Sequence, residues 1–196
     1  MVALPEFYVV SGATVKDVID DCPSEIFSAI EKAYRLHAAG ESINPDSYFL
    51  RFPEKPRDRI IALPARLGGD VQRSGLKWIA SFPENTAANL ARASAVQILN
   101  DPGTGYPVAC MEASLISATR TAASAALGAE ALSPTPLRGT LCIVGTGIIA
   151  RATYEWLKFR NWDFDKVNLF DTKRGEAERF AEWLRSNYGE RAEVAD

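Results

Sequence analysis

The pattern of hydrophobic and polar positions predicts strands in the middle of the chain, with a helix before them and another after them. From Ile26 onward, apolar residues recur at helical spacing through residues 24–39 and form one face of a helix. Pro23 suits the first turn of that helix, because the N–H that proline lacks would have no partner there. Gly40 is expected to end the helix.

Apolar and β-branched residues predict strands at 7–10, 48–52, 59–63, 76–81, 95–99 and 106–111. The last two strands flank an Asn-Asp-Pro-Gly-Thr-Gly segment, whose residues favour a turn, so they are expected to form a hairpin. A helical turn is expected at 14–19. A long helix is expected at 113–132, which contains no proline and one glycine.

Residues 141–150, LCIVGTGIIA, form the strand, glycine turn and helix start of a dinucleotide-binding βαβ unit. Gly145 permits the tight turn, and Gly147 lets the backbone approach a pyrophosphate. Ala150 allows close packing of helix on strand. Asp171 follows the next apolar run, 21 positions after Ala150, where such folds carry the acid that binds ribose. An ordinary strand-to-helix turn is the alternative interpretation.

An acid at position 171 favours NAD over NADP, because it accepts hydrogen bonds from the 2′-hydroxyl and repels a 2′-phosphate. Lys173 and Arg174 follow at once and would instead favour a 2′-phosphate. The order of elements predicts an α/β fold. An α+β substrate and dimerisation domain over 1–138, including the long helix, is followed by an incomplete, parallel, doubly wound Rossmann domain over 139–196.

Three basic residues are candidates for binding an anionic substrate. Lys77 is flanked by apolar residues, and burial lowers a lysine pKa toward the range of proton transfer. A solvated strand lysine is the alternative. Arg51 and Arg120 could bind carboxylates with the two donors of a guanidinium fork. Arg120 lies in an otherwise uncharged stretch, and a salt bridge to Glu112 or Glu130 is the alternative role for it.

Composition narrows the function further. The chain has 196 residues, 47% hydrophobic and 24% charged, with a net charge of −3, as in a globular protein that binds neither nucleic acid nor an anionic membrane. Cys22, Cys110 and Cys142 are expected to be reduced, as in a cytoplasmic protein. The single histidine, His37, and the scattered cysteines predict no metal site. No signal peptide and no membrane-spanning run are expected.

Four segments resemble the ornithine cyclodeaminase/μ-crystallin family, and the likeness runs from about Tyr8 to the end of the chain. They are RIIALPARLGG, SGLKWIAS, RASAVQILNDPGTGYPVACMEASLISATRTAA and CIVGTGIIA. Within the family, the likeness is greatest to dehydrogenases that make L-2,3-diaminopropionate for siderophores of the staphyloferrin B type. The resemblance implies NAD as cofactor, an amino-acid substrate and a homodimer built through the first domain.

The resemblance also implies roles for individual residues. Arg51 matches an arginine that binds a substrate carboxylate, and Lys77 matches a lysine that binds substrate and assists proton transfer. Arg120 matches an arginine near both the substrate and the nicotinamide phosphate. The expected cofactor-binding residues are Arg92, Arg120, Gly145, Gly147, Ile148, Ile149 and Asp171, with Ile148 and Ile149 acting through their backbone N–H groups.

The implied reaction is NAD-dependent oxidative cleavage of N-(2-amino-2-carboxyethyl)-L-glutamate to 2,3-diaminopropionate and 2-oxoglutarate. The alternatives are ornithine cyclisation, reduction of an imine or α-keto acid, and a nucleotide-binding protein without catalysis. Family members run past three hundred residues, and an aspartate used by the cyclodeaminases lies in their later part. The resemblance therefore implies that residues 1–196 are a fragment or a truncated product, or that a partner supplies the rest, and little turnover is expected of this chain alone.

Overall fold

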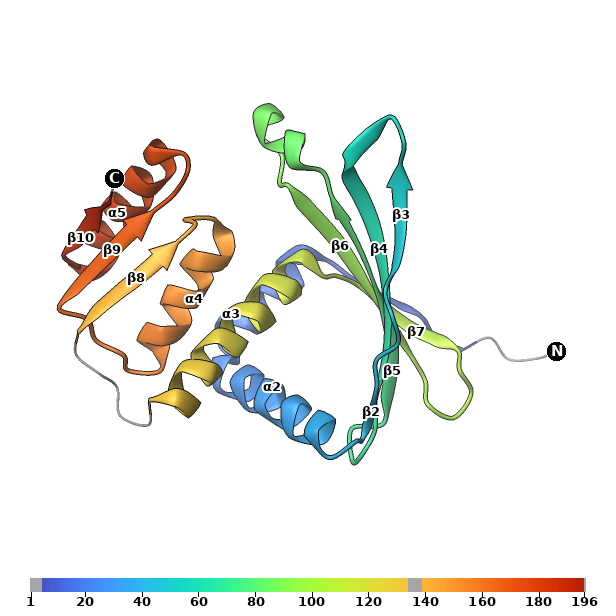
Figure 1. The fold of residues 1–196 in the computed structure, drawn as a ribbon. Helices are drawn as coiled ribbons and strands as arrows, with labels where there is room; N and C mark the ends of the chain where they lie inside the picture. Colours follow the sequence, from blue (N-terminus) through green and yellow to red (C-terminus); the bar gives the residue numbers. More distant parts are fainter. Residues whose placement is uncertain (1–4, 134–138, 196) are drawn as a thin grey trace. The chain divides into compact units, whose positions relative to one another are not determined.

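A computed structural model describes residues 5–133 and 139–195, and the chain divides into two compact units (Figure 1). The first unit is Met1–Ser117 and the second is Ala118–Asp196. The division falls within helix α3, Ser114–Leu132. The sequence places the domain boundary after residue 138, and this boundary stays a prediction. The Ser-Pro-Thr-Pro-Leu-Arg-Gly stretch at 133–139 predicts a linker, and residues 134–138 of it lie outside the described residues.

The first unit is built on a mixed, mostly antiparallel sheet of seven strands. The strands are β1 (Tyr8–Val10), β2 (Ser42–Ile43), β3 (Tyr48–Phe52), β4 (Lys55–Leu67), β5 (Arg73–Ser81), β6 (Ala93–Asn100) and β7 (Pro107–Glu112). Their order is β1-β7-β6-β5-β4-β2, and β3 also pairs with β4. Among the strand pairs of this sheet that the structure describes, β1 and β7 are parallel and the others are antiparallel. The predicted hairpin around residues 100–105 is confirmed as β6 and β7.

The helices of this unit are α1 (Gly12–Asp21), α2 (Pro23–Ala38) and a short 3₁₀ helix, η1 (Pro83–Ala88). The helix α1 is longer than the single turn predicted at 14–19. It begins early because the Ser11 hydroxyl caps it, accepting a hydrogen bond from the Thr14 N–H at 3.3 Å. Strand β4 is also longer than predicted, because its pairing with β5 continues past Pro64 to Leu67.

The register of the strands separates the sheet into two faces. Directly paired residues point to the same side, so Leu63, Lys77 and Gln97 share one face, which we call the inner face. The start of α3 lies on this face, because Lys77 contacts Ser117. The row Tyr48, Ala62, Trp78 and Val96 lies on the opposite side, which we call the outer face.

The second unit is a three-stranded parallel sheet with helices between its strands (Figure 1). Its elements are β8 (Thr140–Val144), α4 (Ile148–Phe159), β9 (Lys166–Phe170), α5 (Arg174–Tyr188) and β10 (Ala192–Val194). The strand order β10-β9-β8 is that of the first mononucleotide-binding half of a Rossmann fold. The α/β fold class predicted from the sequence is confirmed.

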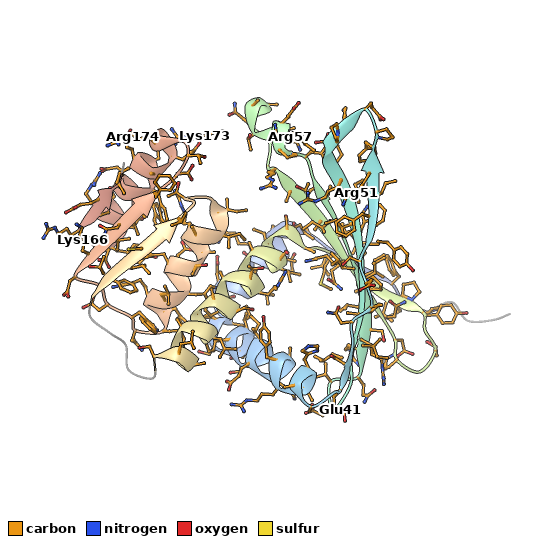
Figure 2. The ribbon with its side chains drawn as sticks, viewed as in Figure 1. Glu41, Arg51, Arg57, Lys166, Lys173 and Arg174 are labelled. Atoms are coloured by element: carbon orange, nitrogen blue, oxygen red, sulfur yellow. The ribbon has the colours of Figure 1, made fainter. Side chains whose placement is uncertain are left out.

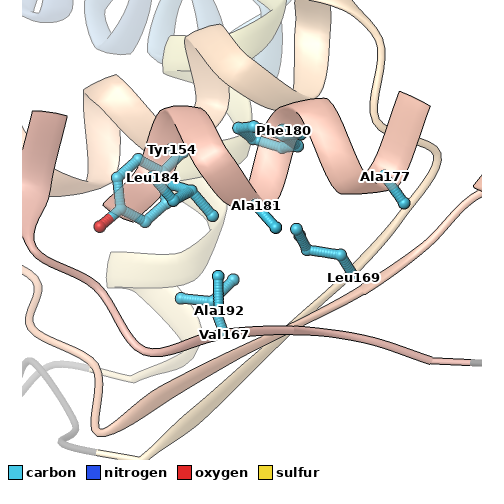
Figure 3. Packing of buried hydrophobic residues seen from close by; sticks show 8 residues of the cluster. All are labelled: Tyr154, Val167, Leu169, Ala177, Phe180, Ala181, Leu184 and Ala192. Atoms are coloured by element: carbon cyan, nitrogen blue, oxygen red, sulfur yellow. The ribbon is translucent and has the colours of Figure 1, made fainter. Parts of the chain in front are cut away.

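One face of this parallel sheet carries the hydrophobic core of the unit (Figure 3). Leu169 from β9 and Phe180 and Leu184 from α5 are almost fully buried with Tyr154 of α4. Each such side chain contributes roughly 1.5–3 kcal/mol by leaving water. This core packs the helices against β9, and the carboxyl ends of β8 and β9 carry the glycine turn and Asp171.

Candidate functional site

The glycine turn lies between β8 and α4 and is tied to the neighbouring strand. Gly145 has a φ of +87°, a backbone conformation that favours glycine, and its N–H donates to the Phe170 carbonyl at 2.8 Å. Gly147 precedes the first residue of α4. A Cβ added at Gly147 would meet no atom within 4 Å, so open space lies in front of this backbone. A diphosphate group can approach the chain there.

The N-terminus of α4 leaves donors available for that diphosphate. The first N–H groups of a helix have no intrahelical partner, and no side chain caps this end of α4. Ile148 and Ile149 occupy the first two helical positions, and the Ile148 side chain is 71% exposed. The free N–H groups and the helix dipole together attract anions. The turn therefore has the geometry expected of a pyrophosphate site.

Asp171 follows β9 directly, and hydrogen bonds hold its carboxylate beside the glycine turn. Its Oδ2 accepts from both the backbone N–H and the hydroxyl of Thr146, each at 2.8 Å. Its Oδ1 accepts from the backbone N–H of Lys173 at 2.9 Å. These bonds, that from Lys173 most strongly, lower the pKa of Asp171 below its usual value. The carboxylate is therefore charged and fixed in place at neutral pH.

The two basic residues after Asp171 differ in their surroundings. Both lie at the exposed start of α5 (Figure 2). Arg174 donates from Nε to Glu178 at 3.1 Å, so its charge is partly neutralised. Lys173 contributes its backbone N–H to Asp171. The charged group that is hydrogen-bonded to the glycine turn is therefore the carboxylate of Asp171, and neither basic side chain.

In the first unit, the structure places Arg51 and Lys77 on the inner face of the sheet. Lys77 is half-buried between β4 and β6, and its Nζ donates to the Ser117 hydroxyl at 3.1 Å. The predicted alternative of a freely solvated strand lysine is therefore wrong. The guanidinium of Arg51 lies 5.0 Å from the Phe49 ring, a cation–π contact, and Arg51 is exposed (Figure 2).

The salt bridges considered for Arg120 are not formed, because both acids have other partners. Glu112 accepts hydrogen bonds from the backbone of Ser114 and Leu115 at the start of α3. Glu130 pairs with Arg160 at 2.6 Å. Arg120 itself is exposed on α3. The sequence suggested that a charge in this uncharged helix would be costly without an anionic partner. Because Arg120 is exposed to solvent, its charge does not carry that cost.

The remaining cofactor candidate, Arg92, lies in the first unit just before β6, while the glycine turn lies in the second. Arg92 is exposed, and its carbonyl accepts from the Phe82 N–H at 2.9 Å. His37 has a structural contact, because its Nδ1 lies 2.7 Å from the Ser42 hydroxyl. Within residues 5–133 and 139–195, no cluster of His, Cys, Asp and Glu could hold a metal ion.

Sequence reasoning missed Thr146 and Ser117. The glycine spacing assigns no role to Thr146, although its position inside the turn, with an acid at the end of the next strand, is a signal for this contact. Ser117 contacts Lys77 across 40 positions of sequence, and no local pattern predicts that contact. Among the described helices, none has the length and apolar character to cross a bilayer.

These features define an α/β protein. Its first unit has a mixed sheet that carries basic side chains, and its second unit has the strand order of the first half of a Rossmann fold. The model of the ornithine cyclodeaminase/mu-crystallin family matches residues 13–195. The chain therefore belongs to this family, as its sequence motifs indicated.

Known relatives agree with this assignment. The N-((2S)-2-amino-2-carboxyethyl)-L-glutamate dehydrogenase of Staphylococcus aureus is 38% identical over 158 residues, which cover 79% of this chain and 47% of that protein. A Thermococcus litoralis Δ1-pyrroline-2-carboxylate reductase, solved with NADH and L-proline, matches with a TM-score of 0.84 and 25% identity. An archaeal alanine dehydrogenase dimer with bound NAD matches with a TM-score of 0.84 and 29% identity.

Both of these structural matches cover 97% of this chain, but 57% of the reductase chain and 56% of the alanine dehydrogenase chain. The chain thus spans about half the length of the relatives it matches. The shared part holds the first unit and the first half of the nucleotide-binding sheet. The fold similarity therefore extends over both groups of candidate residues described above.

The contact between Thr146 and Asp171 gives a direct prediction. In Thr146→Val the hydroxyl donor is lost, so the pKa of Asp171 is expected to rise toward its usual value, as measured by carbon-detected NMR titration of the carboxyl group. Asp171 stabilises the fold above its unfolded pKa of about 4, and this stabilisation is lost as the pH falls through the lowered folded-state value. In the valine variant, the stabilisation by Asp171 is therefore lost at a higher pH than in the wild type, so the protein unfolds at a higher pH on acidification. Thr146→Ser is the matched control and keeps the low pKa; an unchanged pKa in the valine variant would show that the hydroxyl contact is unimportant.

Proposed function

We propose that the protein is an NAD-dependent dehydrogenase that oxidatively cleaves N-(2-amino-2-carboxyethyl)-L-glutamate. The observation that carries this proposal is the uncapped glycine turn with a fixed carboxylate, Asp171, beside it. The named activity of the Staphylococcus aureus relative supports the choice of substrate. The products would be 2-oxoglutarate and L-2,3-diaminopropionate, a precursor for siderophores.

The residues of the second unit fit the ADP half of NAD. Gly145 and Gly147 keep side chains away from the diphosphate, and the N–H groups of Ile148 and Ile149 donate to it. Asp171 accepts hydrogen bonds from the adenosine ribose and disfavours a 2′-phosphate, so NAD is preferred to NADP. When bound, the nicotinamide would accept a hydride from the α-carbon of the glutamate moiety.

The basic residues of the first unit suit the substrate. Arg51 binds a carboxylate through its guanidinium fork, and Lys77 binds and orients the substrate from a half-buried position. Arg120 and Arg92 add positive charge for the substrate and the nicotinamide phosphate. Within this scheme Ser117 is a positioning residue, because it holds the Lys77 ammonium group at 3.1 Å.

The chemistry balances with water as the second reactant. Loss of the hydride from carbon and of a proton from nitrogen leaves a carbon–nitrogen double bond in the substrate. Water adds to that carbon, the carbon–nitrogen bond breaks, and the amine leaves with a proton while the carbon becomes the ketone of 2-oxoglutarate. Lys77 moves protons to and from the substrate nitrogen and the attacking water.

A homodimer formed through the outer face of the first unit is part of the proposal. Tyr48, Trp78 and Val96 are 75%, 41% and 39% exposed and lie in one row across the sheet. A contiguous exposed apolar surface of this kind marks an interaction site. The archaeal relative solved as a dimer supports a second copy as the occupant.

The three free cysteines, Cys22, Cys110 and Cys142, fit a reducing cytoplasm.

Cofactor binding tests the role of the glycine turn. Gly147→Ala should lower the affinity for NAD and for ADP-ribose about 10-fold or more, because the added methyl group occupies the space of the diphosphate. Unfolding should be unchanged, since the new Cβ meets no neighbouring atom. Calorimetric titration measures both ligands. Gly128→Ala, in a helix with the same open space, is the control; equal affinities in the wild type and Gly147→Ala would contradict the assigned site.

Product analysis tests the reaction. With N-(2-amino-2-carboxyethyl)-L-glutamate and NAD, the whole enzyme should form NADH, 2-oxoglutarate and 2,3-diaminopropionate in equal amounts, detected by absorbance and mass spectrometry, whereas residues 1–196 alone should form little or none. Lys77→Met should lower kcat about 10²–10⁴-fold, the usual contribution of a proton-transfer group. Lys55→Met, an exposed lysine at the start of β4, should be neutral. Turnover only with ornithine, proline or alanine would replace this substrate with that of another family member.

The oligomeric state tests the proposed assembly. Sedimentation equilibrium should give the mass of two chains, and Trp78→Glu should shift the protein to monomers, because it places a charge in the apolar outer face. Lys55→Glu, an exposed substitution on β4, should leave the dimer intact. A wild-type protein with the mass of one chain at micromolar concentration would contradict the dimer.

A further inference from the structure

We propose that Arg59 and Arg51 together bind the second carboxylate of a dicarboxylic substrate on the inner face of the first unit. The inference rests on the proposed function, and it names which part of the substrate this end of the sheet recognises. Arg59 begins the RIIALPARLGG segment, but the sequence assigns it no role. Its position follows from the register of β3, β4 and β5.

Arg59 is placed beside the other basic residues by strand pairing. It lies directly opposite Arg51 on β3 and opposite Ser81 on β5. Directly paired residues have Cβ atoms about 5 Å apart. Lys77 lies on the same strand as Ser81 and, four residues before it, points to the same inner face.

The spacing suits an elongated ligand. Four residues of strand correspond to about 13 Å between the Arg51–Arg59 pair and Lys77 along the sheet. Long arginine and lysine side chains shorten this separation from both ends. A substrate with carboxylates at its two ends could therefore contact Lys77 with one end and the arginine pair with the other.

Among the described residues of the first unit, no acid forms an ion pair with either arginine of the pair. Like charges directly opposite in a sheet are destabilising unless another group offsets them. The ion pairs described in this unit are Lys16–Asp20, Lys32–Asp70 and Arg35–Glu31, and neither arginine takes part in them. Asp58 is buried next to Arg59 in sequence, but strand alternation turns it to the outer face.

The Arg59 side chain also has an unsatisfied donor. Its Nε is buried and has no hydrogen-bond partner among the residues that the structure describes. A buried N–H without an acceptor is costly, and a carboxylate can accept from Nε and a terminal nitrogen together. The unpaired charge and the unpaired donor therefore require the same partner, which is a carboxylate supplied by a ligand.

This arrangement selects substrates by their number of carboxylates. A glutamate-derived substrate has a side-chain carboxylate for the arginine pair in addition to its α-carboxylate. Alanine or a pyrroline carboxylate has one carboxylate only, so it leaves the pair unoccupied. The arginine pair accordingly distinguishes a dicarboxylate from the substrates named for the alanine dehydrogenase and pyrroline-carboxylate reductase relatives.

NMR-detected titration of the purified protein with 2-oxoglutarate and with pyruvate tests the proposal. Arg59→Met should weaken 2-oxoglutarate binding about 10-fold or more, as expected for loss of charged hydrogen bonds, and change pyruvate binding less than about 2-fold. Arg59→Lys should lie between, because it keeps the charge and loses the fork. Arg66→Met is the control. Arg66 lies on the same strand, but its side chain points to the opposite face of the sheet and donates to Gln72.

Stability measurements separate this role from a structural one. Without ligand, Arg59→Met should unfold at the wild-type temperature or above it, because it removes an unpaired charge. A fall of several degrees would overturn the proposal, as would equal weakening of both ligands or of neither. If wild-type protein turns over the glutamate-derived substrate and Arg59→Met retains its KM, this inference fails and the proposed function stands. If the wild type binds neither acid and lacks turnover, both fail.

Discussion

Hydrogen bonds between the ends of β8 and β9 are the constraint on which the cofactor site depends. Gly145 binds the Phe170 carbonyl, and Thr146 binds the Asp171 carboxylate with both its backbone and its hydroxyl. These contacts fix the start of α4 and a negative charge next to each other. The buried hydrophobic residues of α4, α5 and β9 pack these elements together. A diphosphate and a ribose are thereby expected at adjoining positions.

The same strand geometry organises the first unit in a different way. Because side chains alternate across a strand, one sequence supplies a basic inner face and an apolar outer face. Lys77 and Trp78 are neighbours in the chain, yet one contacts α3 and the other lies in the exposed apolar row. The proposed substrate site and the proposed dimer contact are therefore separated by the thickness of a single sheet.

Much of this arrangement could be predicted from the sequence. The glycine turn, the downstream Asp171 and the hairpin of β6 and β7 follow from local spacing, and the structure contains all three. The beginning of α1 at Gly12 and the full length of β4 were not predicted, because a serine cap and cross-strand pairing determine them. The serine cap is a local contact whose signal the sequence does contain, whereas the cross-strand pairing joins segments far apart in the sequence and leaves no local pattern.

The same limit applies to the site residues. Arg51, Lys77 and Arg120 stood out by chemistry and by resemblance, while Arg59 becomes visible only once the register places it opposite Arg51. Thr146 and Ser117 are ordinary residues whose contacts arise from tertiary structure. Sequence thus predicts the residues that chemistry marks, and structure adds the residues that orient them.

The most direct measurement of the central claim is an amide NMR titration of the protein with ADP-ribose. We expect the largest chemical-shift changes at the backbone N–H groups of Gly147, Ile148 and Ile149, with further changes at Asp171. Saturable binding whose chemical-shift changes avoid this turn, or no binding at millimolar ligand, would contradict a diphosphate site at the start of α4.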